Sequence, residues 1–235
     1  MRLDQYLTQN FDIQSRNKAN EIIKANKVKV DGKLTLKPSL VVNENMKIEL
    51  LEEDFYVSRA AYKLKYFLNE INLDLKNSNA LDIGSSTGGF TQILLEKEIQ
   101  TVTCVDVGAN QLHQKIKNDK RIEFYENQDI RTFETVEKFD IITCDVSFIS
   151  ILNILNDIDK LAKDKIIILF KPQFEVGSNV KRDKKGVVKD NKAILKARTK
   201  FLDECKLLSW KLTYNAQSKL EGKNGNEEEL FYFNK

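Results

Sequence analysis

A glycine-containing turn joins an apolar run to a helical pattern at residues 81–90, Leu-Asp-Ile-Gly-Ser-Ser-Thr-Gly-Gly-Phe. Glycine at such a turn lets the backbone pass close to a ligand, as it does where open α/β sheets reverse their strand order. The next apolar run ends at Asp106, twenty-two residues beyond Gly84, where a carboxylate can accept both hydroxyls of a ribose. This segment therefore predicts a parallel sheet that binds a nucleotide-like cofactor.

The pattern around this turn alternates short β-rich runs with helical segments from Val57 onward. Five such runs are expected as strands: Ala80–Ile83, Thr101–Val107, Ile122–Glu126, Phe139–Cys144 and Lys165–Phe170. Two more, Trp210–Tyr214 and Leu230–Phe233, follow near the end of the chain. Alternation of this kind predicts an α/β fold in which helices wrap a mostly parallel sheet.

The residues of the turn narrow the choice of cofactor. Ser86 occupies the position of the middle glycine in the dinucleotide fingerprint, where a pyrophosphate needs the closest approach. Asp82 suits a cofactor whose nearby end is cationic, such as S-adenosylmethionine, and Asp129 is placed to accept the adenine amino group, although each aspartate alone could equally cap a helix or turn. The candidate cofactor-binding residues are Asp82, Gly84, Ser85, Ser86, Gly88, Gly89, Phe90, Asp106 and Asp129.

Two ionisable residues, Asp145 and Lys171, end the next two predicted strands and so should emerge at the same edge of the sheet. Methyl transfer from a sulfonium needs mainly an aligned acceptor and a group that removes its proton, and it needs no metal. A lysine near its ordinary pKa of ~10.4 is protonated at neutral pH, but partial burial and a second cation would make it a usable base. Lys63 is a candidate for that cation, or else a surface lysine.

Basic residues gather in two parts of a chain whose formal charge is only +3. Residues 1–50 hold nine Lys/Arg against six Asp/Glu, and residues 165–200 hold eleven against three. Such clusters are typical of a protein that binds a polyanion, or else of solvated faces. The candidate residues for contacts with such a polyanion are Arg2, Arg16, Lys18, Lys29, Lys33, Lys37, Lys181, Arg182, Lys184 and Lys185.

Other classes of protein are disfavoured by what the chain contains. Three cysteines lie singly and there is one histidine, so neither a disulfide framework, a metal site nor a Ser-His-Asp triad is expected. No apolar run reaches the ~18–20 residues that cross a bilayer, and the chain opens directly into amphipathic sequence. We therefore expect a cytoplasmic protein without membrane or metal partners; nothing indicates its oligomeric state.

The first 50 residues have the pattern of a small domain of helices followed by strands. Two short helices are expected first, the second capped by Ser15, and then a hairpin turning at Asp31-Gly32 in which Val28, Val30, Leu34 and Leu36 alternate with polar residues. Five segments, Arg2–Leu7, Ser15–Ala19, Ile23-Lys24, Val28–Lys33 and Lys37–Ser39, resemble the S4 RNA-binding domain, which implies that the basic residues among them contact RNA. The segment 51–56, which contains three consecutive acidic residues, is expected to link this small α+β domain to a second domain at 57–235.

The second domain resembles the RrmJ/FtsJ-type methyltransferases, a Rossmann-like seven-stranded class I fold. The resemblance rests on five segments: Ser58–Leu64, Leu81–Phe90, Asp145–Ser150, Lys171–Glu175 and 222–228. The whole chain is similar to the TlyA family of ribosomal RNA cytidine 2′-O-methyltransferases, in its short type. This implies S-adenosylmethionine as cofactor, a ribosomal subunit as partner and the large-subunit (23S) RNA as substrate. It also implies a catalytic tetrad of Lys63, Asp145, Lys171 and Glu228 with Lys171 as the base, although Glu227 and Glu229 compete for the fourth place.

Other functions remain open at this stage. The chain could be a non-catalytic RNA-binding protein that docks on the ribosome, or an enzyme with dual 16S/23S specificity. Lys63, Asp145 and Lys171 beside an intact cofactor turn argue against the first. A pore-forming role, suggested by the family's older hemolysin name, lacks any segment suited to a membrane. A pseudouridine synthase is disfavoured because a methyl-donor turn follows the S4-like segment.

Overall fold

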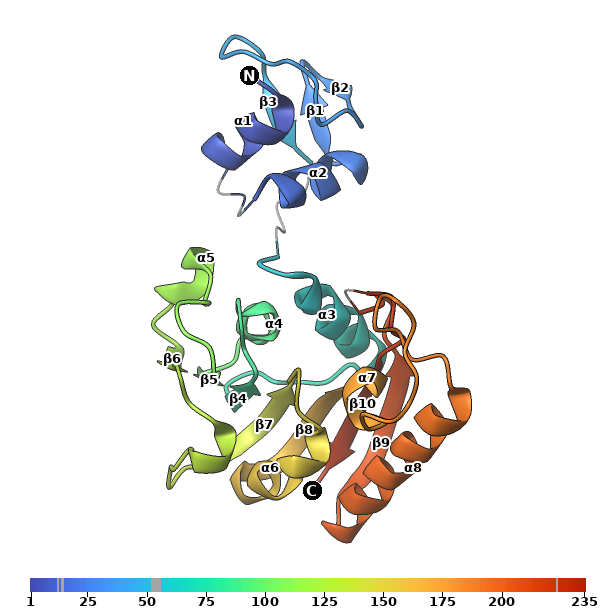
Figure 1. Ribbon diagram of the computed structural model, residues 1–235. Helices are drawn as coiled ribbons and strands as arrows, with labels where there is room; N and C mark the ends of the chain where they lie inside the picture. The colour runs from blue at the N-terminus through green and yellow to red at the C-terminus, as the bar shows by residue number, and fades with distance from the viewer. Residues whose placement is uncertain (12, 14, 52–55, 223) are drawn as a thin grey trace. The chain divides into compact units, whose positions relative to one another are not determined.

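The computed structural model describes residues 1–11, 13, 15–51, 56–222 and 224–235. The chain divides into two compact units, Met1–Phe55 and Tyr56–Lys235 (Figure 1). Residues 52–55 of the predicted linker lie outside the described residues.

The first unit packs two helices, α1 (Leu3–Asn10) and α2 (Arg16–Lys24), on a small antiparallel sheet. Its strands lie in the order β2 (Lys33–Leu34), β1 (Val28–Val30) and β3 (Ile48–Leu50). Ser15 caps α2 by accepting the Lys18 N–H at 3.2 Å, as expected. The core is built from the apolar faces of the helices and of β1: Leu3, Leu7, Ala19, Ile23 and Val28.

The hairpin between β1 and β2 forms where the sequence predicts it, but it is shorter. Asp31 and Gly32 both adopt positive φ, 49° and 75°, the backbone that a two-residue turn between antiparallel strands requires. The expected alternation stops early because β2 covers only two residues. Leu34 and Leu36 are accordingly 49% and 59% exposed rather than packed.

The second unit is built on a seven-stranded sheet in the order β6-β5-β4-β7-β8-β10-β9. Neighbouring strands run parallel except at β10, which pairs antiparallel with both β8 and β9. The strands are β4 (Asn79–Ile83), β5 (Thr101–Val105), β6 (Ile122–Tyr125), β7 (Phe139–Cys144), β8 (Ala162–Phe170), β9 (Lys211–Gln217) and β10 (Glu229–Asn234). All seven predicted strands are therefore present, and the predicted fold class is confirmed.

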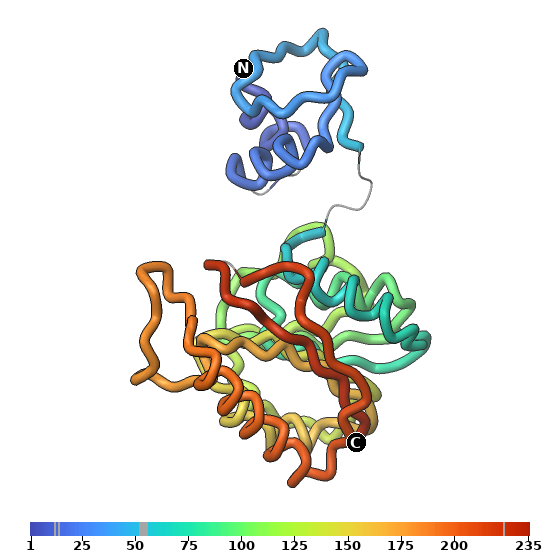
Figure 2. The backbone as a smooth tube through the Cα atoms, turned by 90° about the vertical axis from the view of Figure 1, so that its right-hand side faces the viewer, coloured from blue at the N-terminus to red at the C-terminus, as the bar shows by residue number. Residues whose placement is uncertain are grey.

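Helices cover both faces of this sheet (Figures 1 and 2). On one face α3 (Arg59–Ile71) and α4 (Gly89–Glu96) pack Leu64, Phe67 and Leu94 against the strands. On the other face α6 (Leu155–Leu161) and α8 (Asn191–Leu207) contribute Ile158 and Phe201. Two one-turn helices, α5 (Gln114–Lys117) and α7 (Pro172–Glu175), follow β5 and β8 along the chain.

The register of the parallel strands brings their carboxyl ends to one edge. Ile83, the last residue of β4, pairs with Val105 of β5 and Cys144 of β7, and Cys144 pairs with Ile168 near the end of β8. The loops after four strands therefore meet at this edge, which is where open α/β sheets bind ligands.

Candidate active site

The loop after β4 depends on two glycines that no other residue could replace without strain. Gly84 has a φ of +76°, and a Cβ there would lie 3.0 Å from the Asp145 carbonyl oxygen. Gly88 has a φ of +87°, and a Cβ there would lie 2.2 Å from Cδ1 of Ile116. The first glycine lets the β4 loop lie directly against the loop after β7, and the second starts α4 beneath α5.

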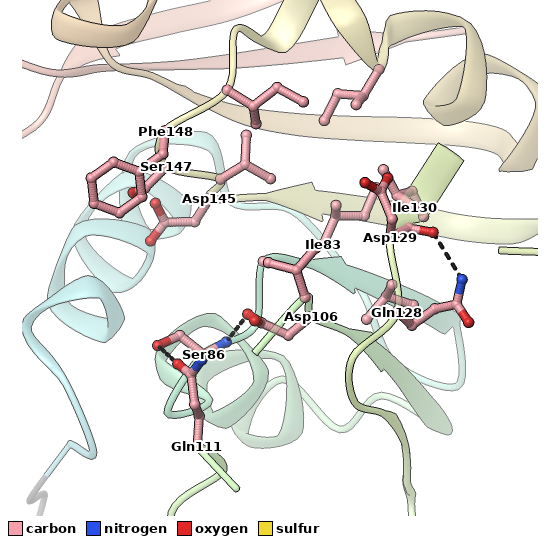
Figure 3. Close-up of a pocket in the computed structure, with 16 residues that line it drawn as sticks. Ile83, Ser86, Asp106, Gln111, Gln128, Asp129, Ile130, Asp145, Ser147 and Phe148 are labelled. Atoms are coloured by element: carbon pink, nitrogen blue, oxygen red, sulfur yellow. Dashed lines mark hydrogen bonds between the residues drawn. The ribbon is translucent and has the colours of Figure 1, made fainter. Parts of the chain in front are cut away.

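Asp106, at the end of β5, organises the floor of the site (Figure 3). One carboxylate oxygen accepts the Ser86 N–H at 2.8 Å and the other accepts the Gly108 N–H at 2.7 Å. The Ser86 hydroxyl donates to Gln111 Oε1 at 2.9 Å, so Gln111 joins the same network. Sequence reasoning missed Gln111, which lies five residues beyond Asp106 in a segment without a motif.

A cavity of about 310 Å³ opens in front of Asp106. Five predicted cofactor-site or catalytic residues line it: Gly84, Ser86, Asp106, Asp129 and Asp145. Its apolar wall is formed by Ile83, Ile130, Ile149 and Ile154. An apolar slot with a few carboxylates at its rim is the usual form of a site for a nucleoside-sized ligand.

A smaller cavity of about 190 Å³ adjoins it. Ser85, Gly89, Phe90 and Lys171 line this second space. Four residues line both cavities, namely Gly84, Ser86, Asp145 and Ser147. These four therefore mark the place where the two spaces meet.

Asp129 combines two of the roles weighed from the sequence. It caps the short turn at Ile130–Thr132 by accepting the Arg131 N–H, and it forms a bidentate ion pair with the Arg131 guanidinium. The pair with Arg131 holds the pKa of Asp129 below its ordinary value. Asp129 still lines the large cavity.

Asp82 does not lie where the sequence interpretation put it. Its side chain is fully buried inside the sheet and lines neither cavity. It accepts hydrogen bonds from Thr91 Oγ1 at 2.6 Å and from Thr143 Oγ1 at 2.8 Å. β4 is flanked by β7 and covered by α4, so a β4 side chain that points away from the cavity contacts Thr143 of β7 and Thr91 of α4. The hydrogen bonds of Asp82 therefore connect these three elements. Gly88 likewise lines neither cavity and serves the loop's shape.

Four charged side chains from distant parts of the chain come together beside the cavities. Lys63 lies on α3, Asp145 follows β7, Lys171 follows β8 and Glu228 precedes β10. Lys171 Nζ lies 2.5 Å from Asp145 Oδ1 and donates to Ser147 Oγ at 2.8 Å. Lys63 forms an ion pair with Glu228. The structure thus gathers the four residues that the resemblance proposes as a tetrad.

The electrostatics of Asp145 show how closely these groups are coupled. Burial raises the pKa of Asp145, and the charges of Lys171 and Lys63 oppose this shift while Glu228 adds to it. Two cations and two anions therefore share one partly enclosed space, and each charge has an opposite partner.

The position of Glu228 separates it from its two neighbours. Its side chain is 3% exposed, and its second oxygen accepts Gln173 Nε2 at 3.2 Å. Glu227 is exposed, and Glu229 points to Arg198, which donates to it at 2.7 and 2.9 Å. Among these three glutamates only Glu228 contacts Lys63.

An exposed aromatic residue at the rim was also missed by sequence reasoning. Phe148 is 92% exposed, adopts a φ of +67° and packs on Phe174 with ring centroids 5.3 Å apart. Glu175 holds the loop that follows, accepting Ser150 Oγ at 2.6 Å and the Ile151 N–H at 2.9 Å. A bulky residue at positive φ is strained, and such strain concentrates at functional sites. Its nearness to Asp145 in the sequence was the one available signal.

The three arginines predicted to bind RNA have partners within the chain. Arg2 and Arg16 both donate to Asp4, whose side chain is 1% exposed. Hydrogen bonding from Arg2 lowers the pKa of Asp4 to about 2. Arg182 donates to the carbonyl oxygens of Gln173, Val180 and Gly177 at 2.8, 2.8 and 3.1 Å. These three arginines therefore have partners within the chain, and a contact between them and RNA stays a prediction.

The remaining candidates for RNA contact are lysines. Five of them are exposed: Lys33, Lys37, Lys181, Lys184 and Lys185. Lys29 is half-buried on β1, and Lys18 lies 3.7 Å from Glu21. The basic character of both segments is thus carried at the surface by lysine.

Two other observations bear on the sequence expectations. Within the described ranges, no group of three or more His, Cys, Asp or Glu side chains could hold a metal ion. None of the helices that the structure describes has the length and apolar character needed to span a bilayer.

Comparison with known proteins agrees with this geometry. Residues 56–235 match the family model of the FtsJ-like methyltransferases, and residues 1–48 match the model of the S4 domain. Fold, cavity and charged cluster thus define a methyltransferase of the FtsJ-like class that carries an S4 domain.

Individual relatives narrow this class. The chain is 48% identical, over 99% of both chains, to the 23S rRNA (cytidine-2′-O)-methyltransferase TlyA of Campylobacter jejuni. It is 33% identical to the 16S/23S rRNA (cytidine-2′-O)-methyltransferase TlyA of Mycobacterium tuberculosis, covering 97% of this chain and 87% of that one. A solved Streptococcus thermophilus structure that carries a hemolysin name is 30% identical, with a TM-score of 0.74 over 100% of this chain and 88% of that one. The chain belongs to the TlyA family.

The buried Asp82 leads to a prediction about stability. Burial raises its folded-state pKa to about 6, above the ordinary 3.8, so the stability it contributes is present at low pH and is lost as the pH rises through about 6. Asp82→Asn removes this titration. Relative to wild type, the variant should gain roughly 3 kcal/mol in free energy of unfolding between about pH 4 and pH 7.

Urea unfolding at a series of pH values measures this difference, and the subtraction cancels all other titrations. Asp119→Asn is the matched control, because the Arg121 pair lowers the pKa of that carboxyl below its ordinary 3.8. Its difference from wild type should therefore be nearly flat above about pH 4 and should change in the opposite direction only below that pH. If the difference in free energy of unfolding between Asp82→Asn and wild type did not change with pH, burial would not raise the pKa of Asp82.

Proposed function

We propose that this protein transfers a methyl group from S-adenosylmethionine to the ribose 2′-hydroxyl of a cytidine in ribosomal RNA. The observation that carries the proposal is Lys171, paired with Asp145 and lining the small cavity that adjoins the large one. Membership of the TlyA family supports the reaction class, and 48% identity to a 23S enzyme favours large-subunit RNA.

The large cavity has the features that S-adenosylmethionine needs. Gly84 lets the backbone approach closely, Asp106 presents carboxylate oxygens to ribose hydroxyls, and Asp129 stands near the apolar slot that suits an adenine. Bound there, S-adenosylmethionine supplies a methyl group made electrophilic by its sulfonium. The chain's own task is to hold the acceptor in line and to take its proton.

Lys171 is the group proposed to take that proton. A ribose hydroxyl is a weak acid, so its oxygen attacks well only when a base within hydrogen-bond reach accepts the proton, and here that base is the neutral amine of Lys171. Asp145 holds the Lys171 side chain, and the Lys63–Glu228 pair places a second ammonium beside the same carboxylate. Phe148 offers an exposed aromatic face at the rim, on which a base unstacked from the RNA could rest.

The first unit is proposed to bind the RNA. Its exposed lysines and its match to the S4 family support phosphate contacts that hold a ribosomal subunit while the second unit acts. Such a substrate would place the protein in the cytoplasm. A second candidate specificity, for both 16S and 23S RNA, has the M. tuberculosis relative in its favour.

Asp106→Ala tests the cofactor site. Losing a charged hydrogen-bond acceptor should weaken S-adenosylmethionine binding by ~10–100-fold, which titration calorimetry can measure. Asp119→Ala removes a carboxylate that pairs with Arg121 away from the cavity and should leave the affinity unchanged. Equal affinity in both variants would remove Asp106 from the site.

Lys171→Ala tests the reaction. Transfer should fall by at least ~100-fold while cofactor affinity stays near wild type, because a proton acceptor is lost and not a binding contact. The measurement is mapping of 2′-O-methylation on 16S and 23S RNA incubated with each protein. Lys163→Ala, a surface change on β8, the strand that Lys171 follows, should retain full activity. Methylation by the Lys171 variant at the wild-type rate would refute the assignment.

A triple change of Lys29, Lys33 and Lys37 to alanine tests the RNA-binding role. Removing three phosphate contacts should weaken rRNA binding and reduce the slope of log K against log salt by about 2–3, with cofactor affinity unchanged. Filter binding at several salt concentrations measures the slope. Three exposed lysines of the second unit, Lys117, Lys120 and Lys138, give a control of equal charge. If both triple variants showed the same slope of log K against log salt, the positive charge of the protein would attract RNA without a defined binding site on the first unit.

A further inference from the structure

Ser147 contacts the charged cluster, and neither the sequence nor the family resemblance gave it a role. It follows Asp145 by two positions, lines both cavities, and accepts a hydrogen bond from Lys171 Nζ at 2.8 Å. The carboxylate of Asp145 lies 2.5 Å from the same nitrogen. Two oxygen atoms on one loop therefore hold Lys171 Nζ.

The number of these partners matches the number of hydrogens on the reactive form of lysine. A protonated lysine carries three N–H bonds, whereas the neutral amine carries two and a lone pair. With one hydrogen donated to Ser147 and the other on the side of the Asp145 carboxylate, its ion-pair partner, the lone pair of the neutral amine has a single direction left. Without the Ser147 hydroxyl, rotation about the Cε–Nζ bond would leave that direction undefined.

We infer that Ser147 is a positioning residue, which together with Asp145 aims the lone pair of Lys171 at the acceptor hydroxyl. This inference rests on the proposed function for the identity of the acceptor, a ribose 2′-hydroxyl. The proton of that hydroxyl passes to Lys171 Nζ, and the electron pair of the O–H bond remains on the oxygen that is to be methylated. Ser147 acts through Lys171 and gains or loses no proton in this step.

The surroundings of Ser147 support a role in direction and not in folding. The residue is exposed, at the junction of the two cavities, and its partner Lys171 keeps the Asp145 carboxylate beside it when the hydroxyl is removed. The loop that carries it is held independently, since Glu175 binds Ser150 and Ile151, and Phe148 packs on Phe174. Removing the hydroxyl should therefore leave the loop in place and release only one of the two partners of Lys171.

Kinetics of Ser147→Ala and Ser147→Thr give the first test. The alanine variant should lose ~10–100-fold in kcat, since misdirection of a reacting group has effects of this size, with KM for rRNA, cofactor affinity and Tm near wild type. The threonine variant keeps the hydroxyl and should recover most of the rate. Wild-type kcat in the alanine variant, a loss confined to KM, or no recovery with threonine would each overturn the inference.

Crystal structures of the ligand-free variants give a second test that does not depend on activity. In Ser147→Ala, Lys171 Nζ should leave its position or occupy several, whereas in Ser147→Thr it should stay. Ser86→Ala removes a hydroxyl from the same two cavities without touching Lys171, so Nζ should not move there. An unmoved Nζ in Ser147→Ala would overturn the inference. If the wild-type protein methylates no rRNA, the proposed function fails, while the position of Nζ still decides the role of Ser147.

Discussion

The site depends on the contact between the loops that follow β4 and β7. Gly84 lies so close to the Asp145 carbonyl that a Cβ would approach it to 3.0 Å. This contact is possible because β4 and β7 are parallel neighbours whose last residues, Ile83 and Cys144, pair directly. It brings the cavity in front of Asp106 next to the charged cluster around Asp145, because Asp145 itself lines that cavity. A shift of one residue in this register would turn every side chain of β7 to the other face and separate the two sites.

The charged cluster is held by mutual pairing. Lys63, Asp145, Lys171 and Glu228 are all largely shielded from water, and a buried charge without a partner is strongly unfavourable. Each ion pair joins a residue of one helix or strand end to a residue far away in the chain, 165 positions away for Lys63 and Glu228. The cluster therefore forms only when α3, the sheet and the segment before β10 are all in place. The same pairing sets the reactive lysine in a fixed position, so folding and catalytic geometry depend on the same contacts.

The differences between the sequence analysis and the structure share a physical cause. Asp82, Arg2, Arg16 and Arg182 were interpreted by residue type and position as contacts for a ligand or for RNA. In the structure Asp82 is satisfied by two threonines inside the sheet, and the arginines are satisfied by Asp4 or by carbonyl oxygens of a loop. Charge in a sequence shows that a partner is needed, but an internal partner and an external one look alike until the chain is folded. The lysines kept their surface positions because their long, strongly hydrated side chains rarely find such internal partners.

Local patterns by themselves determined the seven strands, the glycine turn at Gly84, the hairpin at Asp31-Gly32 and the strand-end positions of Asp106, Asp145 and Lys171. These features depend on neighbours in the chain: apolar runs of strand length, glycine at positive φ, and a polar residue where a buried run stops. Tertiary structure alone decided that Glu228 and not Glu227 or Glu229 meets Lys63, that Asp82 turns inward, and that Ser147 shares Lys171 with Asp145. Consecutive residues of an extended segment point to opposite sides, so only the packing of that segment against α3 and α7 selects the one that enters the site.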